Sequence, residues 1–74
     1  MNQLQQSIQI KTAYITLGQL LKEANVIETG GMAKWFLEEH NVVVNDMSES
    51  RRGRKLYPGD CVSIEGIGSF VVTR

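Results

Sequence analysis

In the first third of this 74-residue chain, the pattern of hydrophobic and polar positions changes from strand-like alternation to helical spacing. Residues 1–7 are glutamine-rich and are expected to be frayed. Residues 8–11 then alternate apolar and polar side chains, as a half-buried edge strand does. Residues 16–25 place leucines and an alanine at helical spacing, and Thr16 and Gln19 stand three positions apart, as in a capping box. The pattern predicts a strand followed by a capped helix.

A second helix is predicted over residues 31–40. Its apolar face includes one histidine, and the face consists of Ala33, Phe36, Leu37 and His40. Thr29 is a candidate N-cap for this helix. Asn41 is suited to the left-handed conformation that often ends a helix.

After the second helix the pattern changes to that of short strands. Asparagine, aspartate, proline and glycine mark turns at 45–46, 57–60 and 66–68. The Pro58-Gly59 pair fits the centre of a type II turn. The apolar segments between the turns predict strands at 42–44, 61–65 and 69–73. The fold class is therefore α+β, with one strand, two helices and then a largely antiparallel sheet of three or four strands, all in one domain over residues 8–74.

Composition limits the possible functions. The chain has 42% apolar and 22% charged residues, which is typical of a compact domain, but its length leaves little room for an enclosed catalytic cavity. Cys61 and His40 are the single cysteine and histidine, so neither a disulfide nor a metal-ligand set is expected. His40 has no partner in a recognisable catalytic motif, and Cys61 is expected to be a small buried hydrophobe. We expect a protein that is not an enzyme and uses no cofactor.

The expected location is the cytoplasm. A lone cysteine is typical of a reducing compartment. No apolar run approaches the roughly 18–20 residues that span a bilayer, and residues 1–11 are too polar for a signal peptide. We therefore expect neither a membrane partner nor, in the absence of a Walker loop or paired carboxylates, a small-molecule substrate.

Charge is concentrated in one segment, the basic loop of residues 51–55, which reads Arg51-Arg52-Gly53-Arg54-Lys55. The formal net charge of zero combines +4 in this loop with −3 over residues 1–50 and −1 over residues 56–74. Arginine and lysine side chains form charge-assisted hydrogen bonds to phosphate, and a glycine lets the backbone approach it closely. The pattern favours phosphate recognition. The alternatives are a solvated turn for the loop and an ordinary turn glycine for Gly53.

Weaker candidates lie outside the basic loop. Lys34 follows the Gly30-Gly31 pair, where exposed backbone N–H groups at a helix start favour an anion, although a solvated lysine is an equal alternative. Trp35 and Tyr57 are candidates for stacking on unpaired bases. Trp35 flanks the apolar face of its helix, which favours core packing, and Tyr57 equally fits a cap on the sheet. The secondary cationic candidates, for which solvation is the favoured role, are Lys22 and Lys11.

The order of several segments resembles the S4-type RNA-binding domain of ribosomal proteins, and most of all its small stand-alone bacterial members of the YaaA type. The segments that carry this resemblance are Thr16 to Lys22, Gly30 to Leu37, Val42 to Asn45, Arg51 to Leu56, and Tyr57 to Val62. The resemblance implies two antiparallel helices packed on a small, mainly antiparallel sheet of four to five strands. It also implies binding of structured RNA, with ribosomal RNA or a ribosomal subunit as the partner.

This chain departs from the family pattern in its helices. Members often begin the first helix with Arg-Leu-Asp, where this chain has Thr16 and Gly18 at the two charged positions. They often carry several basic residues on the second helix, where Lys34 stands almost alone. We therefore expect the basic loop to bear most of the RNA contacts.

Three other functions can be weighed against RNA binding. In a protein-interaction module, the loop would dock on an acidic partner and an exposed sheet edge would pair with a partner strand. A DNA-binding accessory protein would use the same charges on duplex DNA. A ubiquitin-like sulfur carrier is disfavoured, since this chain ends Val72-Thr73-Arg74 and lacks the Gly-Gly tail of that class.

Overall fold

A computed structural model describes residues 5–74. Its main sheet has five strands in the order β1-β7-β6-β3-β4, and β2 pairs with β5 in a separate two-stranded ribbon. Within the main sheet, β1 runs parallel to β7 and the other neighbours are antiparallel. The main-sheet strands are β1 (Gln5–Gln9), β3 (Val42–Val44), β4 (Met47–Ser48), β6 (Cys61–Ile64) and β7 (Gly68–Thr73). The ribbon strands are β2 (Ile15–Thr16) and β5 (Lys55–Leu56).

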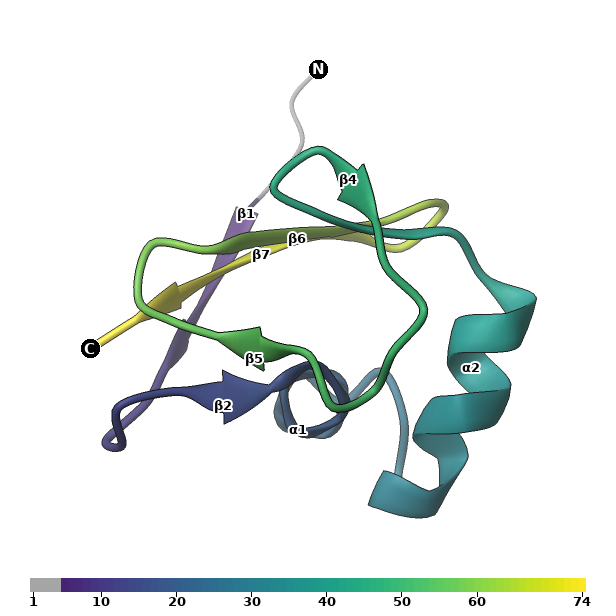
Figure 1. Ribbon diagram of the computed structural model, residues 1–74, viewed down its shortest axis with the longest axis horizontal. Helices are drawn as coiled ribbons and strands as arrows, with labels where there is room; N and C mark the ends of the chain where they lie inside the picture. The colour runs from purple at the N-terminus through teal and green to yellow at the C-terminus, as the bar shows by residue number, and fades with distance from the viewer. Residues whose placement is uncertain (1–4) are drawn as a thin grey trace.

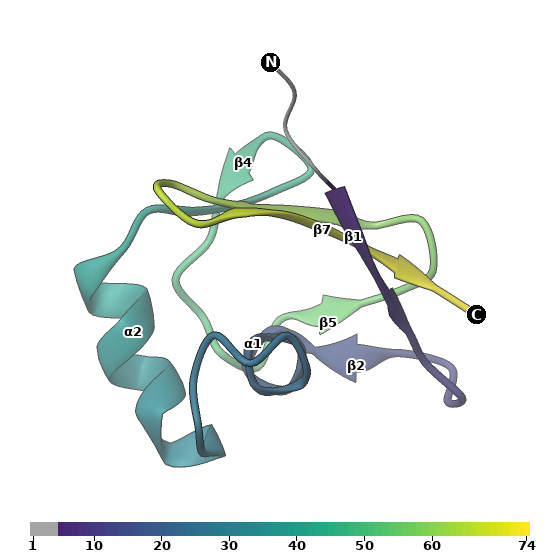
Figure 2. The ribbon, with the colours of Figure 1, turned by 180° about the vertical axis from the view of Figure 1, so that it is seen from behind.

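The helices lie on one side of the sheet (Figures 1 and 2). They are α1 (Leu17–Glu23) and α2 (Ala33–Glu39), and a short 3-10 helix, η1 (Gly30–Met32), precedes α2. Figure 1 looks along α1 and sees α2 from the side, so the helices cross, where the family resemblance implied an antiparallel pair. The expected α+β class, with two helices on a mostly antiparallel sheet, is confirmed.

One hydrophobic core joins the helices to the sheet. Alternate residues of β3, β6 and β7 face this core, as the period of a half-buried strand requires. The most completely buried side chains are Leu17, Leu20, Leu21, Val44, Leu56, Val62 and Val72. Leu56 of β5 ties the small ribbon to the same core, which fixes the position of the segment that ends the basic loop.

The N-terminal segment differs from the prediction. Residues 5–7, expected to be frayed, belong to β1, and their partners are Ser69, Phe70 and Val71 of β7. The edge strand predicted at 8–11 therefore starts three residues earlier and ends two residues earlier, at 5–9. The polar residues of β1 are tolerated because this edge strand buries little apart from Ile8. The rest of the predicted frayed segment, residues 1–4, lies outside the described residues.

The cap predictions have mixed outcomes. The capping box of α1 is confirmed: the Gln19 N–H donates to Thr16 Oγ1 at 3.2 Å, and the Thr16 N–H donates to Gln19 Oε1 at 2.9 Å. Thr29 precedes η1 but makes no side-chain cap hydrogen bond. The α1 segment ends two residues before Asn25, which takes the left-handed conformation with φ 60°.

The prediction that Asn41 is left-handed was wrong. The backbone is already extended at His40, and the carbonyl of Asn41 accepts from the Glu65 N–H at 3.1 Å. The Asn41 side chain also donates to Glu65 Oε1 at 2.7 Å. Pairing next to the β3–β6 ladder therefore determines the conformation that follows the helix.

The predicted turns at 45–46 and 57–60 form and are linked to each other. Asn45 and Asp46 both have positive φ between β3 and β4. The type II turn at Pro58-Gly59 is confirmed, because Gly59 has φ 99° and the Asp60 N–H donates to the Tyr57 carbonyl at 2.9 Å. The Asn45 side chain donates to Asp60 Oδ1 at 3.0 Å, which ties the two turns together beside the start of β6.

Candidate nucleic-acid interface

The backbone of the basic loop is bound to the first turn of α1. The Leu17 N–H donates to the Arg54 carbonyl at 2.8 Å, and the Gly18 N–H donates to the Arg52 carbonyl at 2.9 Å. The first N–H groups of a helix have no partner within the helix, so the loop carbonyls satisfy donors that would otherwise need water or a side chain. This arrangement holds the loop across the start of α1, between β4 and β5 (Figure 1).

The loop and both helices meet at Gly18. It is buried, and a Cβ atom at this position would lie 3.4 Å from both the Ala33 Cβ and the Arg52 carbonyl oxygen. Glycine stands where family members often carry aspartate, and a side chain longer than a methyl group would meet these two segments. A shallow depression forms at this junction, lined by Thr16, Gly18, Gln19, Gly30, Ala33, Arg52 and Gly53. The structure thus brings the basic loop next to the start of the second helix, where the exposed Lys34 lies.

Glu49 organises two of the loop arginines. Its carboxylate forms ion pairs with Arg51 Nε at 3.0 Å and with Arg54 Nη1 at 2.8 Å. The Glu49 side chain is only 6% exposed, whereas the side chains of Arg51 and Arg54 are 75% and 32% exposed. The hydrogen bond from the Arg51 side chain is the main reason why the pKa of Glu49 falls to about 2, against the opposing effect of burial.

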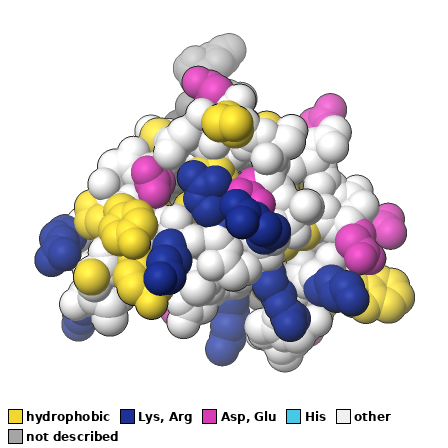
Figure 3. All heavy atoms as spheres, viewed as in Figure 1, with side chains coloured by type: hydrophobic (Ala, Val, Ile, Leu, Met, Phe, Trp, Pro, Cys, Tyr) yellow, Lys and Arg dark blue, Asp and Glu magenta, His cyan; other side chains and the backbone are white. Residues whose placement is uncertain are grey.

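This pairing changes the charge that the loop presents. In the sequence, Glu49 was counted with the −3 of residues 1–50. In the structure it belongs to the basic loop, and the segment 49–55 carries +3, compared with +4 for residues 51–55 alone. Arg54 is partly buried and serves as a support for the loop as well as a cation. Arg51 keeps most of its surface exposed while Glu49 fixes its position. Dark blue Lys and Arg side chains spread across the middle and lower part of the face in Figure 3, with a magenta acidic side chain among them.

Lys55 and two tyrosines form a cluster beside the loop. The Lys55 Nζ lies 5.0 Å from the centroid of the Tyr14 ring, and the Tyr14 and Tyr57 rings are 5.7 Å apart with their planes tilted by 48°. Tyr57 was a secondary candidate, but Tyr14 was missed. A signal existed in the sequence: Tyr14-Ile15-Thr16 and Lys55-Leu56-Tyr57 both alternate exposed and buried positions. The antiparallel register of β2 and β5 was required to bring these segments together.

The remaining candidates are more scattered. Trp35 is 70% exposed on α2, so the expectation that it packs in the core was wrong, because the buried stripe of α2 consists of Ala33 and Leu37. Lys11 and Lys22 line one depression between the end of β1 and α1, together with the acidic Glu23. Neither lysine lines the Arg52–Gly53 depression, although Gln19 borders both depressions.

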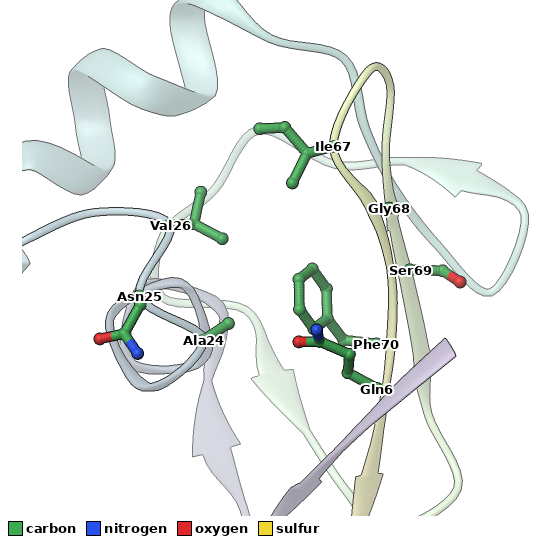
Figure 4. A pocket seen from close by; sticks show the side chains of 8 residues that line it. All are labelled: Gln6, Ala24, Asn25, Val26, Ile67, Gly68, Ser69 and Phe70. Atoms are coloured by element: carbon green, nitrogen blue, oxygen red, sulfur yellow. The ribbon is translucent and has the colours of Figure 1, made fainter. Parts of the chain in front are cut away.

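A further hollow lies between the end of α1 and the β6–β7 turn (Figure 4). Val26, Ile67 and Phe70 project into it, whereas Asn25 points away. Among residues 5–74, no charged side chain lines this pocket. The hollow is therefore unsuited to phosphate.

His40 and Cys61, the residues considered for catalysis or metal binding, each contact a residue of another kind. The His40 ring stacks on Phe36 with centroids 4.1 Å apart. Cys61 is half-buried rather than buried, because it lies on the face of β6 opposite the core-facing Val62 and Ile64. Its Sγ accepts a 3.7 Å hydrogen bond from Gln5 Nε2. Within residues 5–74 no cluster of three His, Cys, Asp or Glu residues is placed to hold a metal ion. No helix in that range is long and apolar enough to cross a membrane.

Two helices on a small, mostly antiparallel sheet fit the family resemblance, although the helices cross rather than run antiparallel. The family model of the S4 domain matches residues 8–73, and the chain belongs to this family. A curated relative from Bacillus subtilis (strain 168) is named "Probable ribosome maturation protein RlbA". It is 68% identical to this chain over 65 residues, which cover 88% of this chain and 92% of the relative. The similarity therefore extends over nearly the whole length of both chains.

Proposed function

We propose that this protein is a non-catalytic RNA-binding protein that recognises structured ribosomal RNA during maturation of a ribosomal subunit. The S4 domain and the name of the Bacillus relative support the class of target. The observation that carries the proposal is the attachment of the basic loop to the first turn of α1 while Arg51, Arg52 and Lys55 remain exposed. A ribosomal target also agrees with the cytoplasmic location expected from the sequence.

The proposed interface uses a rigid loop as a phosphate-binding surface. Glu49 holds the Arg51 guanidinium in place, so less side-chain freedom is lost when a phosphate binds. Arg52 adds an exposed guanidinium at the junction with the helices, and Lys34 adds a cation at the start of α2. A Cβ atom at Gly53 would meet nothing within 4 Å, so the packing gives no reason for glycine there. Close approach of a phosphate to the backbone supplies a reason.

The shape of folded RNA, rather than base sequence, is the feature that such a surface would recognise. Phosphate contacts position a protein on a nucleic acid but carry little sequence information. RNA differs from DNA in its A-form geometry and its 2′-hydroxyl groups. The junction of α1, α2 and the basic loop offers a fixed set of cations for such a shape.

The test is a salt-series titration against ribosomal RNA fragments, with duplex DNA of equal phosphate count as competitor. The variant Arg52→Gln/Lys55→Gln removes two exposed loop cations and should weaken RNA binding by about tenfold or more at low salt. The slope of log affinity against log salt should become shallower by about 2, one for each lost phosphate contact. The matched control is Lys11→Gln/Lys22→Gln, which removes the same charge elsewhere and should change affinity by less than about threefold.

Three results would contradict the proposal. Equal losses for the loop variant and its control would show a general charge effect without a site. Equal binding of RNA and DNA would show attraction to any polyanion, or a DNA-binding role. Absence of RNA binding at low salt, together with binding to an acidic protein, would favour the protein-interaction module.

A further inference from the structure

The strongest feature outside the loop–helix junction is the outward face of the β2–β5 ribbon. The register pairs Ile15 with Leu56 and Thr16 with Lys55, so continuation of the antiparallel pairing places Tyr14 opposite Tyr57. Ile15 and Leu56 point into the core, and the alternate positions point outward. The two tyrosines and Lys55 therefore share one exposed face, directly after the basic loop.

The two rings have different surfaces left for a ligand. The Lys55 ammonium lies over the Tyr14 ring at 5.0 Å, which occupies one face of that ring. Tyr57 is the more exposed residue, at 48% against 38% for Tyr14. The rings are 5.7 Å apart and tilted by 48°, so a planar group cannot slide between them and has to stack on the outer face of Tyr57.

The backbone of both tyrosines is held by local hydrogen bonds. The Tyr57 N–H donates to Asp60 Oδ2 at 2.8 Å, and the Tyr57 carbonyl accepts from the Asp60 N–H at 2.9 Å. The Tyr14 carbonyl accepts from Thr12 Oγ1 at 2.8 Å. An aromatic side chain has few rotatable bonds, so a fixed backbone makes this pair a preorganised platform.

We infer that Tyr57, supported by Tyr14, is a stacking site for one unpaired base of the bound RNA, and that Lys55 contacts the phosphate next to that base. The inference rests on the proposed RNA-binding function and adds a recognition element for single-stranded RNA to it. The chemistry of this face identifies a nucleotide as the ligand. Its base offers a flat π surface to the Tyr57 ring, and its phosphate carries the charge that the adjacent Lys55 attracts. Lys55 connects the platform to the basic loop, so one RNA strand can contact both.

The probes are an eight-nucleotide oligouridylate and an RNA duplex of equal phosphate count. Tyr57→Leu removes the aromatic face and keeps an apolar side chain, whereas Tyr57→Phe keeps the face and loses only the hydroxyl. We expect Tyr57→Leu to weaken oligouridylate binding by about 5- to 10-fold, the lower part of the range for one stacked base. Duplex binding should change by less than about twofold, and Tyr57→Phe should bind both probes like the wild type.

A second readout follows stacking directly. The fluorescence of 2-aminopurine within the oligonucleotide is quenched when the base stacks, so quenching should persist with Tyr57→Phe and be lost with Tyr57→Leu. Circular dichroism melting establishes that each variant is folded; if Tyr57→Leu unfolds, Tyr57→Ser replaces it with the same expected losses.

The possible failures separate the two proposals. If folded Tyr57→Leu binds oligouridylate like the wild type, or loses both probes equally, the stacking site is overturned. Duplex binding that still depends on Arg52 and Lys55 would then leave the proposed function standing. If the wild-type protein binds neither probe nor ribosomal RNA fragments, both proposals are wrong.

Discussion

At the scale of single residues, Glu49 has the largest effect on how the basic loop works. Its carboxylate is almost completely covered and bonded to two arginines, so it converts a flexible run of like charges into an ordered structure. The cost is one unit of negative charge within the binding surface. Glu49 therefore orders the loop but lowers its net positive charge. Its removal should increase electrostatic attraction to RNA and loosen the loop.

Glu49→Gln tests this balance through pH. The folded-state pKa of about 2 lies below the ordinary value of 4.5, so the ion pairs contribute stability above pH 4.5 and lose it as pH falls from 4.5 towards 2. At pH 7 the variant should therefore have a lower melting temperature than the wild type. Its free energy of unfolding should be smaller by about 1 kcal/mol, since solvent screens the exposed Arg51. The difference should shrink towards pH 2.

Thermal denaturation of both proteins at pH 7, 4 and 2.5 checks this prediction. A difference that stays constant with pH would show that Glu49 acts through packing rather than charge. The matched control is Glu38→Gln on the exposed surface of α2, which should leave the melting temperature unchanged at every pH.

At the scale of elements, α1 is short and depends on its first turn. It has seven residues, fewer than an isolated helix needs in water, so its stability comes from its cap, the loop carbonyls and its buried leucines. The capping box and the loop together satisfy N–H donors at the same end of the helix. Damage to the cap should therefore affect the loop as well as the helix.

Thr16→Ala should cost about 1 kcal/mol of folding stability, the usual value for loss of an N-cap side chain. For a chain of this size, that lowers the melting temperature by roughly 4–8 °C. Thr29→Ala is the matched control, because Thr29 makes no side-chain cap hydrogen bond, and it should melt close to the wild type. Equal melting temperatures for both variants would show that the capping box does not stabilise α1.

At the scale of the whole molecule, the two ends of the described chain meet in the main sheet. β1 lies parallel to β7, and the Ile10 N–H donates to the Thr73 carbonyl at 2.8 Å where the chain leaves β1. This pairing covers one edge of β7 and brings Ile8 against the core. The N-terminal strand is thus part of the sheet.

Adjacent positions of β1 provide a test with its own control. Ile8→Asp places a charge against the hydrophobic core and should cost at least about 2 kcal/mol, measured by urea denaturation. Gln9→Asp adds the same charge at the neighbouring exposed position and should cost less than about 0.5 kcal/mol. If both variants are as stable as the wild type, β1 does not pair with β7 in solution.

The sequence by itself determined the features that depend on neighbours along the chain. Thr16 and Gln19 form a capping box because their spacing suffices, and Gly59 forms a type II turn because few other residues tolerate positive φ there. The charge of the basic loop and the resemblance to the S4 domain were also evident in the sequence.

Only the tertiary structure decided which distant residues meet. Tyr14 meets Tyr57 because β2 pairs with β5, and the carbonyls of Arg52 and Arg54 meet the first turn of α1 because the loop folds back across it. Residues 5–7 look frayed by composition, yet β7 offers them a row of backbone partners. Periodicity and composition describe each segment alone, whereas pairing, burial and charge neutralisation depend on segments that the sequence does not place side by side.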